Sequence, residues 1–548
     1  MPLVLKPLVL KSRVLKLLML KLLVLKNLVL KNLAKVLCAK ASSSQELWQH
    51  LRPRQPLQPA PCGLSGPGRP QAAVRNLLSP PGPRGWPLLG SLPNMDPKRS
   101  HESVLELCKT FGPIISYRLG SQLFIVINDY DLAKELLDDE NFTGRSRSVV
   151  IQRQTGGCGL LFSEGLLWKQ HRRLALKTLR DFGFAKDRSV EMVNIQLDDI
   201  LTDLRDASES ARPLNILDTF TEATNAVIAT LTLGRQFRRG DPELEFVRTA
   251  ARRLFAGRPL QNLPFLFPWT DYIVRLFPTS NEQNLVNMEI LEFIQRQVQE
   301  RLKLMGADIE GFEPECLCDV YIKERQKAEA AGDFESFKDM QVLRVVMELF
   351  MAGTDTTARS LEWLLLYMAF EQDWQSRVQA ELDRVIDGER RPSMRDRDQL
   401  PLTCAVIEET YRIVSLTPFA LFHPATQEDT VFHGYSFPTN ALIFPFTYGM
   451  SRDPKVWARP NEFHPEHFLR PDGSFAGSGK NIPFSMGRRV CVGESLGRME
   501  VFLIFSAVMK LFKVCMADEY LSKREDILRG SLGILRIPGD YRLLFEAR

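Results

Sequence analysis

The sequence lacks the segments that would place it in several common classes of protein. Its first 40 residues contain no run of the roughly 20 apolar residues that a membrane-spanning helix needs. A glycine-rich fingerprint for a dinucleotide or a flavin is also missing, which argues against a built-in domain for either cofactor. The nine cysteines lack the spacing of a secreted disulfide framework, and Cys316 and Cys318 are too close for a metal-binding C-x-x-C pair. We therefore expect a reducing compartment and mostly free thiols.

Acidic residues are absent from the first 45 positions, which carry nine of the 71 lysines and arginines. The rest of the chain therefore has 62 basic against 66 acidic residues, and no positive excess that would indicate a nucleic-acid partner. Lysines recur about every five positions in this N-terminal segment, an advance of about 140° beyond one helical turn, so they spread around a helix axis. A membrane-surface segment, a mitochondrial presequence and an artefact of gene prediction all remain open for residues 1–45.

Proline and glycine are frequent in residues 46–79, which are expected to form a linker before a single domain over residues 80–548. Helical periodicity outweighs strand patterns in this domain, so the expected fold is mostly α with a small β part. Hydrophobic residues make up 44% of the chain, enough for a large core. Helices are expected over 101–111, 131–137, much of 185–340, 339–370 and 496–512, strands over 114–118 and 123–127, and a loop over 144–159.

One stretch, residues 484–493, reads Phe-Ser-Met-Gly-Arg-Arg-Val-Cys-Val-Gly and places a single cysteine between glycines and beside arginines. Glycine lets a loop turn tightly and lets its backbone approach a flat ligand. The N–H groups at the start of the following helix, together with the arginines, are expected to lower the pKa of the Cys491 thiol. A thiolate held in this way is a suitable axial ligand for haem iron, whereas a buried structural cysteine is the alternative.

The long helical pattern over 339–370 contains the hexamer Ala-Gly-Thr-Asp-Thr-Thr at residues 352–357. Ala352 and Thr356 are four apart and share a helix face, where a small residue admits something flat and large. A hydroxyl next to the carboxylate of Asp355 is suited to delivering protons. A kink made by threonines that bond to backbone carbonyls is the alternative interpretation.

Two further pairs have helical spacing. Glu409 and Arg412 are three apart and are able to form an ion pair, which contributes little to stability if it is exposed. Trp168 and Arg172 are four apart on a common face, where a surface aromatic–cation contact is the simplest interpretation.

These motifs, in this order, resemble the cytochrome P-450 family from about residue 78 to the C-terminus. The match to Phe484-x-x-Gly-x-Arg489-x-Cys491-x-Gly493 holds position for position. The resemblance implies the cytochrome P-450 fold, a single haem-thiolate domain with haem b (iron protoporphyrin IX) and Cys491 as the iron ligand. It also implies a mono-oxygenase that uses O2 and electrons from NADPH through a separate reductase, with a cytochrome b-type protein as an alternative donor. The implied substrate is small and apolar: a fatty acid, a steroid or a xenobiotic.

The resemblance also assigns roles to individual residues. Thr356 takes the place of the oxygen-activating threonine, and Asp355 relays protons. A third residue, His467, completes a buried network with Glu409 and Arg412, as in animal microsomal families that metabolise drugs, steroids and fatty acids. The residues expected to bind haem besides Cys491 are Trp168, Arg172, Arg145, His423, Arg489 and Phe484. Those expected to line the substrate pocket are Ala352, Thr417, Phe419, Leu421 and Leu532.

The same resemblance implies partners and a location. The basic face formed by Lys169, Arg173 and Lys177 is expected to receive an acidic, flavin-containing reductase. A proline-rich segment over residues 80–87 resembles the hinge of membrane-bound members, so the expected place is the endoplasmic reticulum membrane, with a mitochondrial membrane as the alternative.

Two other functions compete with the mono-oxygenase. A haem-thiolate isomerase or dehydratase that acts on lipid peroxides commonly lacks the threonine that this chain has as Thr356. A non-catalytic haem-binding protein needs neither Asp355 and Thr356 nor a basic face for a reductase. The sequence therefore favours the mono-oxygenase over both alternatives, and it does not identify the substrate.

Overall fold

The computed structural model describes residues 78–182, 187–237, 240–255, 259–274, 282–388, 390–428 and 430–548. All of them belong to one compact unit, Ala73–Arg548. The basic repeat over residues 1–45 and all but the last residues of the expected linker lie outside the described part of the chain.

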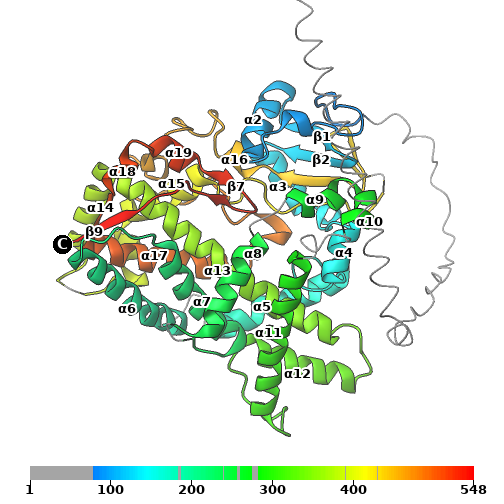
Figure 1. Ribbon diagram of the computed structural model, residues 1–548, viewed down its shortest axis with the longest axis horizontal. Coiled ribbons are helices and arrows are strands. Elements are labelled where there is room, and N and C mark those ends of the chain that lie inside the picture. Colours follow the sequence, from blue (N-terminus) through cyan, green and yellow to red (C-terminus); the bar gives the residue numbers. More distant parts are fainter. Residues whose placement is uncertain are drawn as a thin grey trace, which may run out of the picture. The chain divides into compact units, whose positions relative to one another are not determined.

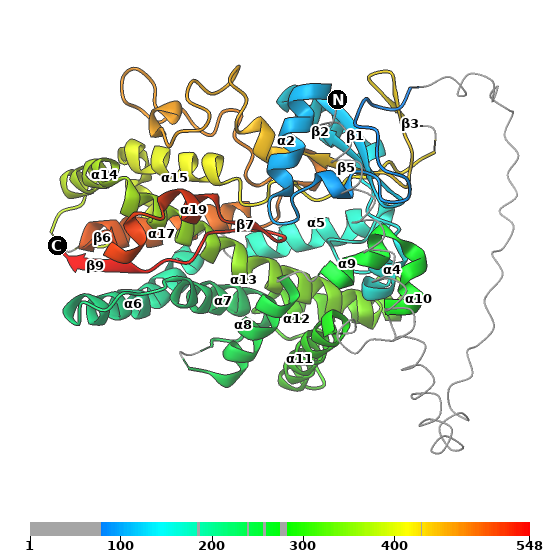
Figure 2. The ribbon, with the colours of Figure 1, turned by 45° about the horizontal axis from the view of Figure 1, so that its top comes forward.

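The long helix α13 (Asp339–Phe370) runs through the middle of this unit in both views (Figures 1 and 2). It packs against α7 (Leu217–Leu233), α11 (Glu282–Met305), α15 (Pro401–Val414) and α17 (Glu494–Leu511). Most residues of α7, α13, α15 and α17 are buried, as expected for helices that are apolar around most of their circumference. The hydrophobic core therefore surrounds α13.

Close packing between α13 and α7 depends on a glycine. A Cβ atom at Gly353 would come within 2.7 Å of the Ile228 side chain on α7, so a larger residue there would push the helices apart. Next to it, the Thr224 hydroxyl on α7 donates a hydrogen bond of 2.8 Å to the backbone carbonyl of Thr354 on α13. The glycine thus serves helix packing at the centre of the motif 352–357.

The other helices surround this core. They are α2 (Ser100–Phe111), α3 (Tyr130–Asp138), α4 (Val149–Thr155), α5 (Gly165–Asp181), α6 (Asp187–Glu209), α8 (Pro242–Phe255), α9 (Pro259–Leu266), α10 (Asp271–Val274), α12 (Leu317–Ala330), α14 (Gln372–Val385), α16 (Thr447–Met450), α18 (Asp518–Leu521) and α19 (Arg524–Arg529). The expected helices over 101–111, 131–137, 339–370 and 496–512 are confirmed to within a few residues.

The largest sheet described has the strand order β1-β2-β5, with β1 (Ile114–Leu119) antiparallel to β2 (Gln122–Ile127) and β2 parallel to β5 (Leu442–Pro445). This confirms the expected strand pair. The remaining strands form pairs: β3 (Thr430–Phe432) with β4 (Tyr435–Phe437), β6 (Phe512–Met516) with β9 (Leu543–Ala547), and β7 (Ser531–Leu532) with β8 (Arg536–Ile537). Figures 1 and 2 place the β1-β2-β5 sheet and the β6-β9 pair at opposite ends of the unit. The fold is mostly α with a small β part, as expected.

The proline-rich segment that precedes α2 packs on the sheet. The Ser116 N–H group donates a 2.8 Å hydrogen bond to the Pro81 carbonyl, and the Ser116 hydroxyl donates one of 2.6 Å to the Pro80 carbonyl. Further upstream, Leu78 forms a β-bridge with Tyr435 of β4. The folded domain therefore includes Leu78, and residues 80–90 lie along its edge.

One expectation for the chain was wrong in part. The predicted loop over 144–159 contains the short helix α4. The glycine, serine and arginine residues of this stretch had indicated a loop. Tertiary contacts stabilise α4, because Arg153 forms a bidentate ion pair of 2.7–3.0 Å with Asp271 of α10 and Gln154 bonds to Asn284 of α11. In the described part of the chain, every helix is too short or too polar to cross a membrane.

Candidate active site

The cysteine loop, residues 484–493, is closed by backbone contacts. The Cys491 N–H group donates a 3.0 Å hydrogen bond to the Phe484 carbonyl, and Gly493 is the N-cap of α17. Gly487 has φ of +71°, and a Cβ atom there would overlap the Leu137 carbonyl at the end of α3. Glycine at 487 is therefore required by the left-handed backbone of a tight turn, as expected, and by close packing on α3.

The Cys491 side chain lies in an exposed position at the start of α17. The N–H groups of Gly493 and Glu494 and the Arg172 guanidinium favour its thiolate, as expected. The protein atoms around the sulfur desolvate it although the residue keeps an exposed surface, and the Glu494 carboxylate acts in the same direction. Desolvation is the largest effect, so the net pKa of the thiol is raised. The expected net lowering by protein groups was wrong, because desolvation outweighs the helix N-terminus and the arginine.

Two expected haem-binding residues, Arg489 and Trp168, stack against each other. The Arg489 guanidinium carbon lies 3.9 Å from the centroid of the Trp168 ring, and both side chains are buried. Arg489 also donates hydrogen bonds to the backbone carbonyls of Thr143 at 2.7 Å and Ser163 at 2.8 Å. Its neighbour Arg488 points elsewhere and donates to the backbone carbonyl of Asp138.

The region around Arg489 and Trp168 also contains three more of the expected haem-binding residues: Arg145, Arg172 and His423. Arg145 is buried and donates to the carbonyls of Leu161 at 2.8 Å and Phe422 at 3.0 Å. Arg172 on α5 donates to the Val490 carbonyl at 2.6 Å, next to Cys491. His423 is buried, and its Nδ1 atom lies 3.2 Å from the Phe142 carbonyl.

The three guanidinium groups form a cationic cluster that fits an anionic ligand. Among the described residues, none of Arg145, Arg172 and Arg489 forms an ion pair with a carboxylate. Their hydrogen bonds go to backbone carbonyls. Burial lowers the pKa of Arg489 to about 8 and that of Arg145 to about 10, and the arginines repel one another. A buried cation without a counter-ion is costly. This donor set fits the two propionate groups of haem b, whose iron the nearby Cys491 would ligate.

The face of α13 that carries the hexamer borders the same region. Ala352 is exposed although most of its helix is buried, so open space lies over it. The Thr356 hydroxyl donates a 2.9 Å hydrogen bond to the Ala352 carbonyl. Asp355 lies 3.6 Å from the Arg359 guanidinium one turn further on.

The helix α17, which follows the cysteine loop, meets α13 next to Thr356. A Cβ atom at Gly497 would sit 3.6 Å from both the Thr357 hydroxyl and the Phe484 ring, so a small residue lets the loop, α17 and α13 converge. The structure thus brings the cysteine loop to the hexamer, although the two segments are more than 120 residues apart in the sequence.

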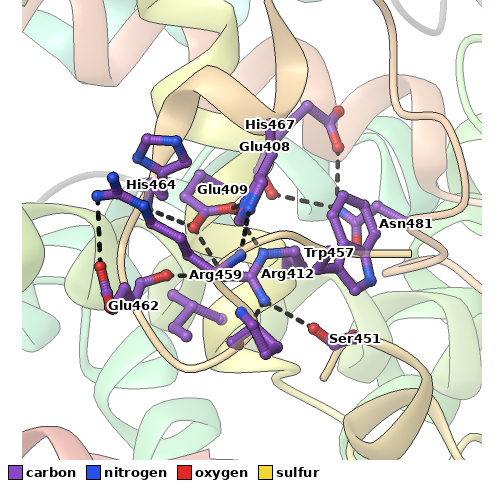
Figure 3. A network of polar contacts seen from close by, with 12 residues as sticks. Glu408, Glu409, Arg412, Ser451, Trp457, Arg459, Glu462, His464, His467 and Asn481 are labelled. Carbon is purple, nitrogen blue, oxygen red and sulfur yellow. Dashed lines mark hydrogen bonds and ion pairs between the residues drawn. The ribbon is translucent and has the colours of Figure 1, made fainter. Parts of the chain in front are cut away.

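Glu409, Arg412 and His467 form one buried network (Figure 3). Both carboxylate oxygens of Glu409 lie 2.7 Å from Arg412 nitrogens, and neither side chain is exposed to solvent. His467 Nδ1 lies 3.3 Å from Glu409, and the His464 N–H group donates a 2.6 Å hydrogen bond to the same carboxylate. Arg412 also donates to the carbonyls of Ser451, Pro460 and Glu462 at 2.6–2.8 Å. The network therefore ties α15 to the segment that leads to the cysteine loop.

A second polar network beside the first was missed. Glu408 accepts a 3.1 Å hydrogen bond from Asn481 and forms an ion pair with Arg498 of α17, which also pairs with Glu494. The only sequence signal was the spacing of four between Glu494 and Arg498. Figure 3 shows Glu408 and Asn481 next to the buried network around Arg412.

The residues expected to line the substrate pocket differ in their exposure and in their contacts. Leu421 is 44% exposed. Phe419 stacks on Phe446 with 5.0 Å between ring centroids, so much of its surface packs on the sheet. The Thr417 carbonyl accepts a hydrogen bond from Thr447, whereas Leu532 of β7 donates its N–H group to the Lys98 carbonyl.

These features define a haem-thiolate protein: one cysteine in a closed loop, a cationic cluster for propionates and a small-residue face on a central helix. The family model of cytochrome P450 matches residues 80–545, and the chain belongs to this family. It is similar to cytochrome P450 2J5 of Mus musculus, at 32% identity over 479 residues that cover 85% of this chain and 90% of that protein. Cytochrome P450 2B4 of Oryctolagus cuniculus is 31% identical over 490 residues, with coverage of 88% and 96%. Cytochrome P450 2K6 of Danio rerio is 33% identical over 436 residues, with coverage of 78% and 83%.

Membership makes the chain a P450 mono-oxygenase, an oxidoreductase with haem as cofactor that uses O2 and electrons from a redox partner. When bound, the haem supplies the iron at which O2 is activated, with the cysteine thiolate as electron-donating ligand. One oxygen atom enters the substrate and the other leaves as water, which consumes a pair of electrons and a pair of protons.

Proposed function

We propose that this enzyme hydroxylates small, apolar organic molecules such as fatty acids, steroids or xenobiotics, with electrons from NADPH delivered by a separate reductase. The observation that carries the proposal is the pairing of Ala352 and Thr356 on one face of α13, which gives an apolar opening beside a hydroxyl. Haem binding in this proposal uses Cys491, with Arg145, Arg172, Arg489, Trp168 and His423 around the propionates and Phe484 under the loop.

We propose that two residues transfer protons: Thr356 and Asp355. The Thr356 hydroxyl proton lies on Oγ1 and is shared with the Ala352 carbonyl, so Oγ1 must give up that bond to donate elsewhere. The Asp355 carboxylate lies 3.6 Å from the Arg359 guanidinium, a contact that is long for a tight pair. Rotation of these two side chains therefore provides a route for protons toward the open side of α13.

The reductase is proposed to dock on the outer face of α5. Lys169, Arg173 and Lys177 are exposed there, while Trp168 and Arg172 on the opposite face point into the haem-binding region. Arg172 contacts the carbonyl before Cys491, so an electron donor on this face would be separated from the cysteine loop by a single helix. Lys169 already pairs with Glu140, which leaves Arg173 and Lys177 as the stronger attractors of an acidic partner.

We place the enzyme at the endoplasmic reticulum membrane. Trp86, Leu88, Trp269 and Tyr272 are all more than half exposed. The segments that carry them meet at one turn of the sheet, because the Gly120 N–H group donates to the Leu89 carbonyl and the Ser121 N–H group to the Leu266 carbonyl, each at 3.0 Å. A gathering of exposed aromatic and aliphatic side chains suits contact with a lipid surface.

Thr356→Ala tests the proposal. With reductase and NADPH supplied, we expect the variant to consume NADPH but to release more peroxide and roughly 100-fold less product, because the hydroxyl that steers protons is lost. Haem content is expected to be unchanged, since the hydrogen bond of the Thr356 hydroxyl in the described structure stays within its own helix. Ser360→Ala is the matched control, since its hydroxyl bonds to the Thr356 carbonyl on the same helix.

Two outcomes would contradict the proposal. Equal coupling of NADPH to product in the wild type and in Thr356→Ala would remove Thr356 from the reaction. Turnover of a lipid hydroperoxide without any reductase, unchanged by the substitution, would identify the isomerase or dehydratase instead.

A further inference from the structure

Two of the segments expected to line the substrate pocket are joined by a single residue. The first segment, residues 416–421, follows α15, which ends at Val414. The second is the β7–β8 hairpin, residues 531–537, in which Leu532 pairs with Arg536. The two segments are more than 100 residues apart in the sequence, so the distance between them is set by tertiary contacts alone.

The side chain of Arg536 connects two helix ends. Its guanidinium donates hydrogen bonds to the carbonyls of Ile413, at 3.3 Å, and Val414, the last two residues of α15. It also donates to the carbonyls of Leu528 at 3.0 Å and Arg529 at 3.3 Å, the last two residues of α19. The last carbonyls of a helix lack partners within the helix and carry partial negative charge. One cation therefore holds the C-termini of α15 and α19 together.

The backbone of Arg536 is fixed as well. Its N–H group donates a 2.8 Å hydrogen bond to the carbonyl of Leu416, the first residue of the segment 416–421. Its carbonyl accepts a 3.2 Å hydrogen bond from Trp363 Nε1 on α13, about two turns after Thr356. Arg536 thus ties the hairpin both to the segment 416–421 and to the central helix.

The base of the hairpin is buried, whereas its tip is not. The Arg536 side chain is only 4% exposed, and its hydrogen bonds within the described structure go to backbone carbonyls. Ile534, at the tip, is 53% exposed. Replacing a buried charge by an apolar side chain is often neutral or stabilising, so a guanidinium here indicates a need for contacts that an apolar residue cannot make.

We propose that Arg536 is a positioning residue: it fixes the distance between the hairpin 531–537 and the segment 416–421 and so determines which C–H bond of a bound substrate is oxidised. This inference rests on the proposed function and specifies what controls its selectivity. Arg536 acts through the two segments and does not touch the substrate. A displacement of about 1 Å in a site of this kind changes a rate by up to roughly 100-fold, so small shifts of either segment are sufficient.

Arg536→Lys keeps the charge and removes the fork of donors. A lysine presents its donors from one point, so it is unable to reach the ends of α15 and α19 at once. The haem-loaded enzyme, with reductase and NADPH, is given dodecanoic acid or testosterone, each of which offers several C–H bonds. We expect the ratio of hydroxylated products to change by at least about threefold and KM to rise more than kcat falls. Haem content and the carbon monoxide band are expected to remain as in the wild type.

Arg452→Lys is the matched control. Arg452 also donates to the Ile413 carbonyl at the end of α15, and its guanidinium carbon lies 3.6 Å from the centroid of the Tyr448 ring. Its hydrogen bonds within the described structure do not reach the hairpin 531–537. We expect this variant to be less stable than the wild type but to give the same product ratio. A lost arginine at the end of α15 is thereby separated from a lost link between the two segments.

Hydrogen exchange of the wild type tests the link without any variant. We expect the Arg536 amide, which bonds to Leu416, to exchange at least about 100-fold more slowly than the amide of Ile534 at the tip. Equal exchange of the two amides would overturn the inference. So would an unchanged product ratio in Arg536→Lys, or an equal change in Arg452→Lys. A wild type that oxidises neither probe with reductase and NADPH would instead count against the proposed function itself.

Discussion

Removing the Glu409 carboxylate tests whether the buried network around Arg412 holds the fold together. In Glu409→Ala the guanidinium of Arg412 loses two hydrogen bonds of 2.7 Å and its only counter-ion among the described residues. The His464 N–H group and His467 lose their shared acceptor. Arg412 keeps three backbone carbonyls as partners, but they carry no net charge. The positive charge therefore remains buried and uncompensated.

The magnitude follows from the burial of the pair. Both side chains have no exposed surface, so water cannot replace the missing carboxylate, and breaking such a pair costs about 3–5 kcal/mol. A nearby pair with the same spacing offers the comparison: Arg459 and Glu462 lie 3.5 Å apart with side chains 57% and 68% exposed. An exposed pair contributes about 0–1 kcal/mol, so Glu462→Ala is expected to be nearly neutral while its backbone carbonyl still serves Arg412.

The assay is urea unfolding of the haem-loaded protein, together with the haem-to-protein ratio after purification. We expect Glu409→Ala to give unstable or haem-depleted protein and Glu462→Ala to behave as wild type. If Glu409→Ala unfolds within about 1 kcal/mol of the wild type and retains its haem, the argument from burial is refuted.

Two further predictions concern Glu500 and Gly487. Burial raises the pKa of Glu500 to about 8, above its value in the unfolded chain, so the protonated form is favoured on folding and stability falls as the pH rises from about 4.5 to 8. Glu500→Gln should therefore be more stable than the wild type by about 3 kcal/mol at pH 7 and equally stable near pH 4. Thermal unfolding across this pH range measures the difference. A difference that does not change with pH would contradict the raised pKa of Glu500. Gly487→Ala should lower haem retention sharply, because φ is +71° and the new Cβ atom would overlap the Leu137 carbonyl. The control Gly477→Ala has a similar φ of +83° and open space around it, so equal losses in both would show that close packing on α3 is unimportant.

The sequence predicted the parts of the fold that depend on local periodicity. The helix 339–370 and the strand pair before α3 were identified because their apolar spacing is regular and their ends are clear. The helix α4 was missed because its residues are poor indicators on their own and its stability comes from Arg153 and Gln154, which reach α10 and α11. Contacts between segments more than 100 residues apart are not visible in a local pattern.

In the candidate site too, residues in motifs of fixed spacing were predicted, and residues whose role depends on distant contacts were not. Cys491, Thr356 and the pair Glu409–Arg412 were found because their motifs have fixed spacing. The packing of Gly487 on α3 could not be predicted, since only the position of Leu137 reveals what the missing side chain makes room for. Glu408 was overlooked because a glutamate in a helix is ordinarily exposed, and only the fold places it beside Arg498.

The central claim is that Cys491 provides the thiolate ligand of a haem group, and the carbon monoxide spectrum of the reduced protein tests it most directly. The wild type is expected to show the strongly red-shifted absorption band of thiolate-ligated haem. Cys491→His is expected to lose that band, because the only thiol of the loop is gone. Buried Cys404→Ala is the control and should keep it. Persistence of the red-shifted band in Cys491→His would contradict the account.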